Sequence, residues 1–82
     1  MPKIKVRRTA QFNRKFKRLS KLVQKRYMKT LRLLENPAHP SLQTHSYEER
    51  GKGVQGSYTS MRERVFWTRN RTTIFVIDID SH

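Results

Sequence analysis

The 82-residue sequence contains no cysteine, so neither a disulfide nor a thiolate metal site can support its fold. A chain of this length can form one small domain, which we expect to span residues 1–82. Such a domain buries only about 60–65% of the surface that its unfolded chain exposes. The fold therefore has to be stabilised by one modest hydrophobic core.

Long apolar runs are also absent. No segment approaches the roughly 20 apolar residues that a membrane-spanning helix needs, and the N-terminus lacks the apolar stretch of a secretory signal. The lack of cysteine fits a reducing compartment. Together these features lead us to expect a cytoplasmic protein with no membrane partner.

Acidic residues are few. Six Asp and Glu face nineteen Lys and Arg, which gives a formal net charge of +13. An excess of this size opposes compactness through self-repulsion, and it favours salt-sensitive binding to polyanions, because each neutralised phosphate releases counterions. RNA, DNA and acidic protein segments are therefore the expected partners. A basic surface that serves only solubility is the plainer alternative.

The C-terminal part of the sequence has the pattern of a β-hairpin. Residues 65–68 and 72–79 are rich in β-branched and aromatic side chains, and the turn between them contains Asn70, a residue that tolerates positive φ. Alternation along the second strand predicts one apolar face and one face that ends in two carboxylates and an imidazole. The first face comprises Thr73, Phe75, Ile77 and Ile79, and the second comprises Ile74, Val76, Asp78, Asp80 and His82.

The N-terminal half predicts a strand followed by two helices. Residues 3–8 alternate apolar and basic side chains, which is typical of an edge strand. Thr9 and Ser20 are suitable N-caps, and Pro37 ends the helical pattern. Residues 10–35 are therefore expected to form an antiparallel helical hairpin with one apolar and one basic face. The apolar stripes are Phe12, Phe16 and Leu19, then Val23, Tyr27, Leu31 and Leu34.

The middle of the chain supplies the remaining strands. We expect a loop at 36–42, a polar edge strand at 44–49, a basic turn at 51–53 and a strand at 56–61. The order β-α-α-β-β-β favours an α+β fold, with the helices on one face of a small antiparallel sheet. The opposite face would be open and basic, and thus suited to a single RNA strand.

Three segments resemble the RelE/ParE superfamily of toxins. They are the NPAHPSL loop at 36–42, the RVFW run that begins at Arg64, and the IDSH ending at 79–82. The resemblance covers the whole chain in order. It implies a RelE-like fold and a cognate antitoxin as partner in a toxin–antitoxin hetero-oligomer. It also implies the activity of most relatives, which is endonucleolytic cleavage of mRNA on the ribosome.

The same resemblance assigns the catalytic residues. It implies that Arg64 contacts the scissile phosphate, that His82 acts as general acid or base, and, more loosely, that His45 takes the other proton role. RNA can be cut without metal or cofactor, because its own 2′-hydroxyl attacks the neighbouring phosphate. Histidine suits the proton transfers, and arginine grips phosphate oxygens. Asp80 is placed to raise the pKa of His82.

Further residues would bind the RNA. Arg50, Lys52 and Arg62 are expected to hold its backbone, and Tyr58 to stack on a base. Each assignment has a plainer alternative, such as a pairing of Arg64 with Asp78. Asp78, Asp80 and His82 could also suggest a metal site, which is the weaker interpretation. Two other functions remain open: a gyrase-inhibiting ParE-like toxin, and a basic RNA- or ribosome-binding module without activity.

Overall fold

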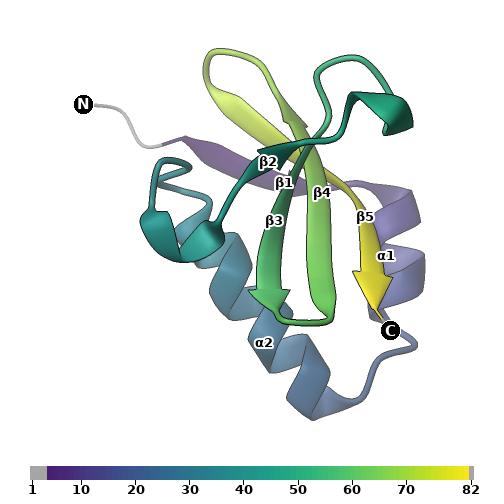
Figure 1. Cartoon of the computed structure of the whole chain (residues 1–82). Coiled ribbons are helices and arrows are strands. Elements are labelled where there is room, and N and C mark those ends of the chain that lie inside the picture. Colours follow the sequence, from purple (N-terminus) through teal and green to yellow (C-terminus); the bar gives the residue numbers. More distant parts are fainter. Residues whose placement is uncertain (1–3, 82) are drawn as a thin grey trace.

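The computed structural model describes residues 4–81 and has the expected α+β architecture (Figure 1). Its strands lie in the order β1-β5-β4-β3-β2, and both helices cover one face of this sheet. No helix within the described part is long and apolar enough to cross a membrane. The elements are β1 (Lys5–Arg8), α1 (Ala10–Phe16), α2 (Lys21–Leu33), β2 (His45–Ser46), β3 (Gln55–Ser60), β4 (Glu63–Arg69) and β5 (Thr73–Ser81), with 3₁₀ helices η1 (Pro40–Leu42) and η2 (Glu48–Arg50).

The sheet differs from the expected one in two respects. β1 pairs with β5 in parallel, so the sheet is mixed and not antiparallel throughout. The helical hairpin makes this possible, because a long crossover lets two strands run in the same direction. The polar strand expected at 44–49 is reduced to the two residues of β2, since the chain turns into η2 directly afterwards. β2 therefore covers only the first part of the β3 edge.

Both predicted N-caps are confirmed. The Thr9 hydroxyl accepts a hydrogen bond from the amide of Phe12 at 3.3 Å and donates one to the carbonyl of Val76 at 2.9 Å. It thereby begins α1 and ties this helix to β5. The Ser20 hydroxyl accepts from the amide of Val23 at 3.3 Å and begins α2. α1 ends at Phe16, earlier than its apolar stripe predicted.

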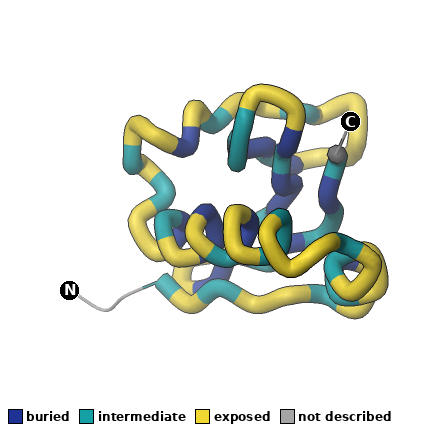
Figure 2. Tube along the Cα trace, turned by 90° about the horizontal axis from the view of Figure 1, so that it is seen from below, coloured by how far each residue is buried: buried dark blue, intermediate teal, exposed yellow. Residues whose placement is uncertain are grey.

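The core lies between the sheet and the two helices. Figure 2 shows the buried positions of both layers turned toward the interior and the exposed positions outside. The predicted stripe of α2 is part of this core, as is Leu42, which the 3₁₀ helix η1 turns inward. The buried cluster comprises Phe12, Tyr27, Leu31, Leu34, Leu42, Val65, Trp67, Ile74, Val76 and Ile79.

A β-bulge corrects the predicted faces of β5. Phe66 pairs with Asp78 and Trp67 pairs with Val76, so Ile77 is an extra residue in β5. One extra residue shifts the alternation of side chains by one position. Ile79 consequently joins Ile74 and Val76 in the core. The expectation that Asp78 and Asp80 share a face with Ile74 and Val76 was wrong.

The hairpin turn uses Asn70 differently from the prediction. Its φ is not positive. Its side-chain oxygen instead accepts hydrogen bonds from the amides of Thr72 at 2.9 Å and Thr73 at 2.8 Å. The asparagine therefore acts as a side-chain cap of the turn.

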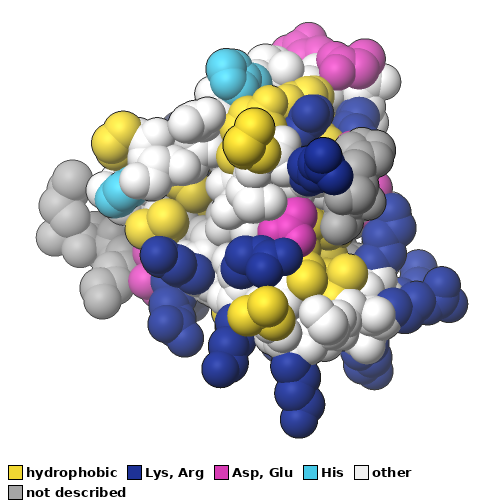
Figure 3. Space-filling view, turned by 60° about the horizontal axis from the view of Figure 1, so that its bottom comes forward, with side chains coloured by type: hydrophobic (Ala, Val, Ile, Leu, Met, Phe, Trp, Pro, Cys, Tyr) yellow, Lys and Arg dark blue, Asp and Glu magenta, His cyan; other side chains and the backbone are white. Residues whose placement is uncertain are grey.

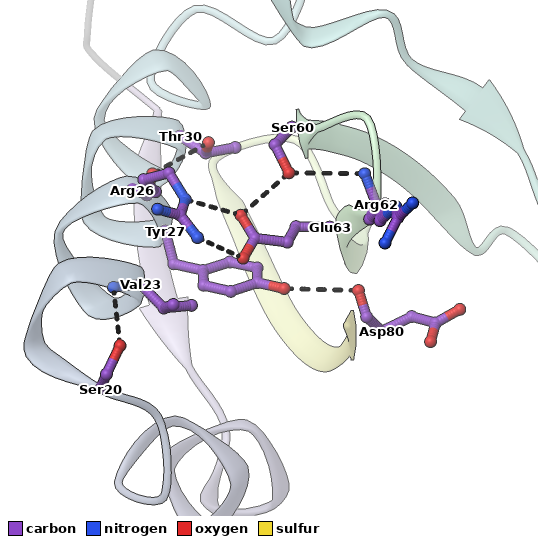
Figure 4. A network of polar contacts seen from close by, with 9 residues as sticks. All are labelled: Ser20, Val23, Arg26, Tyr27, Thr30, Ser60, Arg62, Glu63 and Asp80. Atoms are coloured by element: carbon purple, nitrogen blue, oxygen red, sulfur yellow. Dashed lines mark hydrogen bonds and ion pairs between the residues drawn. The ribbon is translucent and has the colours of Figure 1, made fainter. Parts of the chain in front are cut away.

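An ion pair between the exposed Arg26 and the buried Glu63 joins α2 to the turn between β3 and β4 (Figure 4). Arg26 donates to both carboxylate oxygens of Glu63, at 2.9 and 2.8 Å, and the Ser60 hydroxyl donates to the same carboxylate at 3.0 Å. Glu63 is only 5% exposed. The hydrogen bond from Arg26, assisted by Ser60, outweighs burial and lowers the pKa of Glu63. This pair fixes the start of β4, one residue before Arg64.

Substituting Glu63→Gln should lower the free energy of unfolding at pH 7 by about 1.5–3 kcal/mol, because a charge-assisted fork is lost. A carboxylate with a lowered pKa stabilises the fold above its unfolded pKa of about 4.3, and this contribution disappears as the pH falls through the folded value. Urea unfolding from pH 3 to 7 should therefore show the two proteins converging at low pH. Glu35→Gln, at an exposed position, is the matched control and should change little. A constant difference at all pH values would contradict the assignment.

Candidate functional site

The open face of the sheet carries most of the residues that the sequence singled out. The strand register sets Tyr58, Arg64 and Asp80 side by side across β3, β4 and β5. The neighbouring row consists of His45, Gly56, Phe66 and Asp78, across β2 to β5. Since Val65 and Trp67 point into the core, the alternating residues of β4 face away from the helices.

Arg64 is half-buried between two tyrosines. Its guanidinium carbon lies 5.1 Å from the ring centre of Tyr58 and 5.9 Å from that of Tyr47. Its Nη1 also donates to the Tyr47 hydroxyl at 3.4 Å. The alternative pairing with Asp78 is not found, because Asp78 is paired with other cations. The tyrosines hold a cation in a fixed position on the open face.

Tyr58 also connects Arg64 to His45. The exposed His45 ring on β2 stands edge-on to Tyr58, with 6.2 Å between the ring centres. His45 and Arg64 thus contact the same aromatic ring. The other predicted catalytic residue, His82, lies outside the described residues. The last described residue, Ser81, pairs with Glu63, so β5 continues beside the start of β4.

Tyr47 is a site residue that the sequence analysis missed. Its ring lies over Gly56, where a Cβ would come within 2.5 Å of it, and stands edge-on to Phe66 at 5.2 Å. Burial, helped by a hydrogen bond with Tyr58, raises the pKa of Tyr47 above its ordinary value of 10.0, although Arg64 opposes this. Tyr47 is therefore a neutral phenol at physiological pH. A lone glycine within a strand pattern, which marks a close approach, was the available signal.

Arg50 has a structural role in the same face. Its guanidinium lies 3.8 Å from the ring centre of Phe66 and donates to Asp78 at 3.1 Å, while Lys15 of α1 pairs with Asp78 at 2.7 Å. Burial works against ionisation of Asp78, but the hydrogen bonds from Lys15, the backbone and Arg50 prevail and lower its pKa. The guanidinium of Arg50 is thus paired with Asp78. The predicted contact of Arg50 with the RNA backbone stays a prediction.

The two remaining predicted RNA-binding residues lie at opposite ends of β3. Lys52 is exposed between Gly51 and Gly53, whose φ values of 145° and 78° require glycine. Arg62 is exposed in the turn that joins β3 to β4. They therefore lie beyond the two ends of the open face and do not form one cluster. Within residues 4–81, no three His, Asp or Glu side chains gather as metal ligands.

A second surface lies on the helical side. A groove of about 590 Å³ runs along α2, with Phe16 and Met28 contributing apolar surface and Lys21, Lys25 and Arg32 contributing positive charge. A smaller cavity shares Met28 and Arg32 and extends the groove toward β1. Figure 3 shows Lys and Arg side chains projecting along this side of the molecule. An apolar groove bordered by cations is complementary to an amphipathic acidic segment.

Comparison with known proteins confirms the resemblance at the level of the fold. No protein-family model matches the sequence, and no curated protein matches it. Solved toxin structures do match. The RelBE2 toxin–antitoxin complex of Mycobacterium tuberculosis aligns with a TM-score of 0.80 at 14% identity, over 98% of this chain and 99% of that chain.

Two further structures agree. The archaeal RelE–RelB complex of Pyrococcus horikoshii gives a TM-score of 0.77 at 16% identity, over 96% of this chain and 94% of that one. YafQ of E. coli gives 0.73 at 15% identity, over 96% and 93% of the two chains. The chain thus has the fold of the RelE-type toxins.

The contact between Tyr47 and Gly56 can be tested by a double-mutant cycle. Gly56→Ala should destabilise the protein by about 1–3 kcal/mol, because the new methyl group overlaps the Tyr47 ring. In a Tyr47→Ala background the same change should cost much less, because only the Phe66 ring, 3.2 Å from the new Cβ, remains close. Urea unfolding of the four proteins gives the coupling energy. Equal costs in both backgrounds would show that the ring does not occupy this position.

Proposed function

We propose that the protein is the toxin of a type II toxin–antitoxin system and a metal-independent endoribonuclease. It cleaves mRNA, bound to the ribosome, in the cytoplasm, and so inhibits translation. The observation that supports this best is the guanidinium of Arg64, held by Tyr47 and Tyr58 on the open face with His45 nearby. The likeness of the fold to RelE and YafQ supports it as well.

In the proposed reaction the 2′-hydroxyl of the RNA attacks the adjacent phosphorus. The bond to the 5′-oxygen breaks, and the products are a cyclic phosphate and a 5′-hydroxyl. Arg64 stabilises the charge of the transition state, which can contribute about 3–4 kcal/mol. His45 takes one proton role and His82 the other. Tyr58 stacks on a base.

Arg64→Ala should therefore reduce cleavage by about 10²–10³-fold, because a preorganised charge is removed. Primer extension on mRNA in a purified translation system measures the cleavage rate. Arg7→Ala, an exposed cation on β1, removes the same charge and should leave the rate unchanged. Cleavage that persists in the Arg64 variant would overturn the assignment. DNA damage with intact mRNA would instead favour the gyrase-directed alternative.

The partner we propose is an antitoxin with an acidic amphipathic helix. Lys21, Lys25 and Arg32 would pair with its acidic face, and Met28 and Phe16 with its apolar face. Several structures of similar fold are described as toxin–antitoxin complexes, including those of RelE with RelB and YafQ with DinJ. Such a partner would also offset part of the net charge of +13.

Met28→Glu should weaken binding of this partner at least about tenfold, because a carboxylate would enter an apolar groove next to acidic residues. Calorimetric titration with the product of an adjacent short acidic gene measures the affinity. Leu22→Glu is the matched control, since Leu22 is exposed on the same helix and does not line the groove. An equal loss of affinity in both variants would indicate a general effect of charge and would contradict binding of the partner in the groove.

A further inference from the structure

Asp78 holds two cations that the proposed reaction does not use. Its Oδ1 lies 2.7 Å from the ammonium group of Lys15 on α1, and it also accepts a hydrogen bond from the amide of Ile79 at 2.8 Å. Its Oδ2 accepts a hydrogen bond from Nη1 of Arg50 on η2 at 3.1 Å. Cations from two segments that are far apart in the sequence therefore meet at one carboxylate of the open face.

The groups around this carboxylate are those with which proteins bind phosphate. A guanidinium, an ammonium and a backbone N–H all donate to phosphate oxygens in complexes with nucleic acids. The side chain of Asp78 is only 15% exposed, whereas those of Lys15 and Arg50 are 52% and 39% exposed. The protein's own carboxylate thus takes the place of a phosphate between two cations that solvent reaches.

Arg50 is able to exchange this partner for another anion. Its guanidinium carbon lies 3.8 Å from the ring centre of Phe66, and such a contact uses the face of the guanidinium and leaves its N–H edge for an anion. The backbone amides of Arg50 and Gly51 donate to the carbonyls of Tyr47 and Glu48, within the same short segment. A change of ionic partner at Arg50 therefore breaks neither of these hydrogen bonds.

The net charge of +13 gives such a carboxylate a use. A chain with this charge attracts every RNA without regard to its sequence, because each neutralised phosphate releases counterions. A carboxylate on the binding face opposes this attraction, and it does so equally for all RNA molecules. Only an RNA that is held by further contacts then binds well, so a repulsive element increases the selectivity of binding.

We propose that Asp78 is a built-in competitor of the RNA backbone, which holds Arg50 and Lys15 in the free protein and thereby lowers the affinity of the open face for free RNA. When the substrate binds, one of its phosphates replaces the carboxylate at Arg50. This inference rests on the proposed function, from which it takes the RNA ligand, and it adds a control of affinity at the same site.

The test is the substitution Asp78→Asn, which keeps an oxygen for the amide of Ile79 and removes the charge. Since both cations are exposed, the variant should fold, which urea unfolding checks. The probe is a single-stranded RNA with 2′-O-methyl groups, which lacks the attacking hydroxyl and stays intact. By fluorescence anisotropy the variant should bind this RNA about fivefold more tightly than the wild type. The plot of log K against log salt should steepen by about 0.7 for each additional phosphate neutralised.

Two controls separate this effect from a general change of charge. Glu49→Gln removes the same charge at an exposed position next to Arg50, and it should change the affinity and the salt dependence little. In a protein that already carries Lys15→Gln and Arg50→Gln, Asp78→Asn should no longer increase the affinity. An equal gain in both backgrounds, or weaker RNA binding by the single variant Asp78→Asn, would overturn the proposal.

The uncleavable probe also separates this inference from the proposed function. Tighter binding by Asp78→Asn, together with intact mRNA in the presence of the wild-type protein, would support the role of Asp78 and overturn the endoribonuclease function. Cleavage of mRNA by the wild type, with an unchanged affinity and salt dependence in Asp78→Asn, would overturn the role of Asp78 and leave the proposed function standing.

Discussion

The bulge at Ile77 is the constraint on which the arrangement of the sheet depends. By inserting one residue into β5, it places Ile74, Val76 and Ile79 against the helices and leaves the carboxylates of Asp78 and Asp80 on the open face. Without it, a regular strand that keeps Ile74 and Val76 in the core would turn Ile79 to the open face and the two carboxylates into the core. The bulge lets one strand close a small core and contribute to an ionic surface.

The two faces of the molecule use aromatic and cationic residues in different ways. On the open face, cations lie against rings: Arg64 between Tyr47 and Tyr58, and Arg50 over Phe66. These contacts fix the direction of each guanidinium before any ligand arrives, which reduces the entropy cost of binding. On the helical side the cations border an apolar groove. The two faces of this basic chain therefore present their cations in different settings, against aromatic rings on one side and around an apolar groove on the other.

Polar groups in the interior connect these surfaces to the core. The Trp67 indole donates to the Ser57 hydroxyl at 2.9 Å, which in turn lies 2.8 Å from the Thr44 hydroxyl. The Arg26–Glu63 fork holds the turn that precedes Arg64 (Figure 4). Thr59, by contrast, has a hydroxyl without a partner.

The sequence by itself determined the fold class, the two N-caps and the helix stripes, because periodicity and capping are local properties of the chain. Only the tertiary structure decided which cations are paired with a carboxylate and which residues from distant segments contact one another. The bulge at Ile77, the parallel pairing of β1, the pairing of Arg50 with Asp78 and the seat of Tyr47 over Gly56 all depend on contacts between distant segments. Such contacts carry no periodic signal, since the register between strands is set by how the whole core packs.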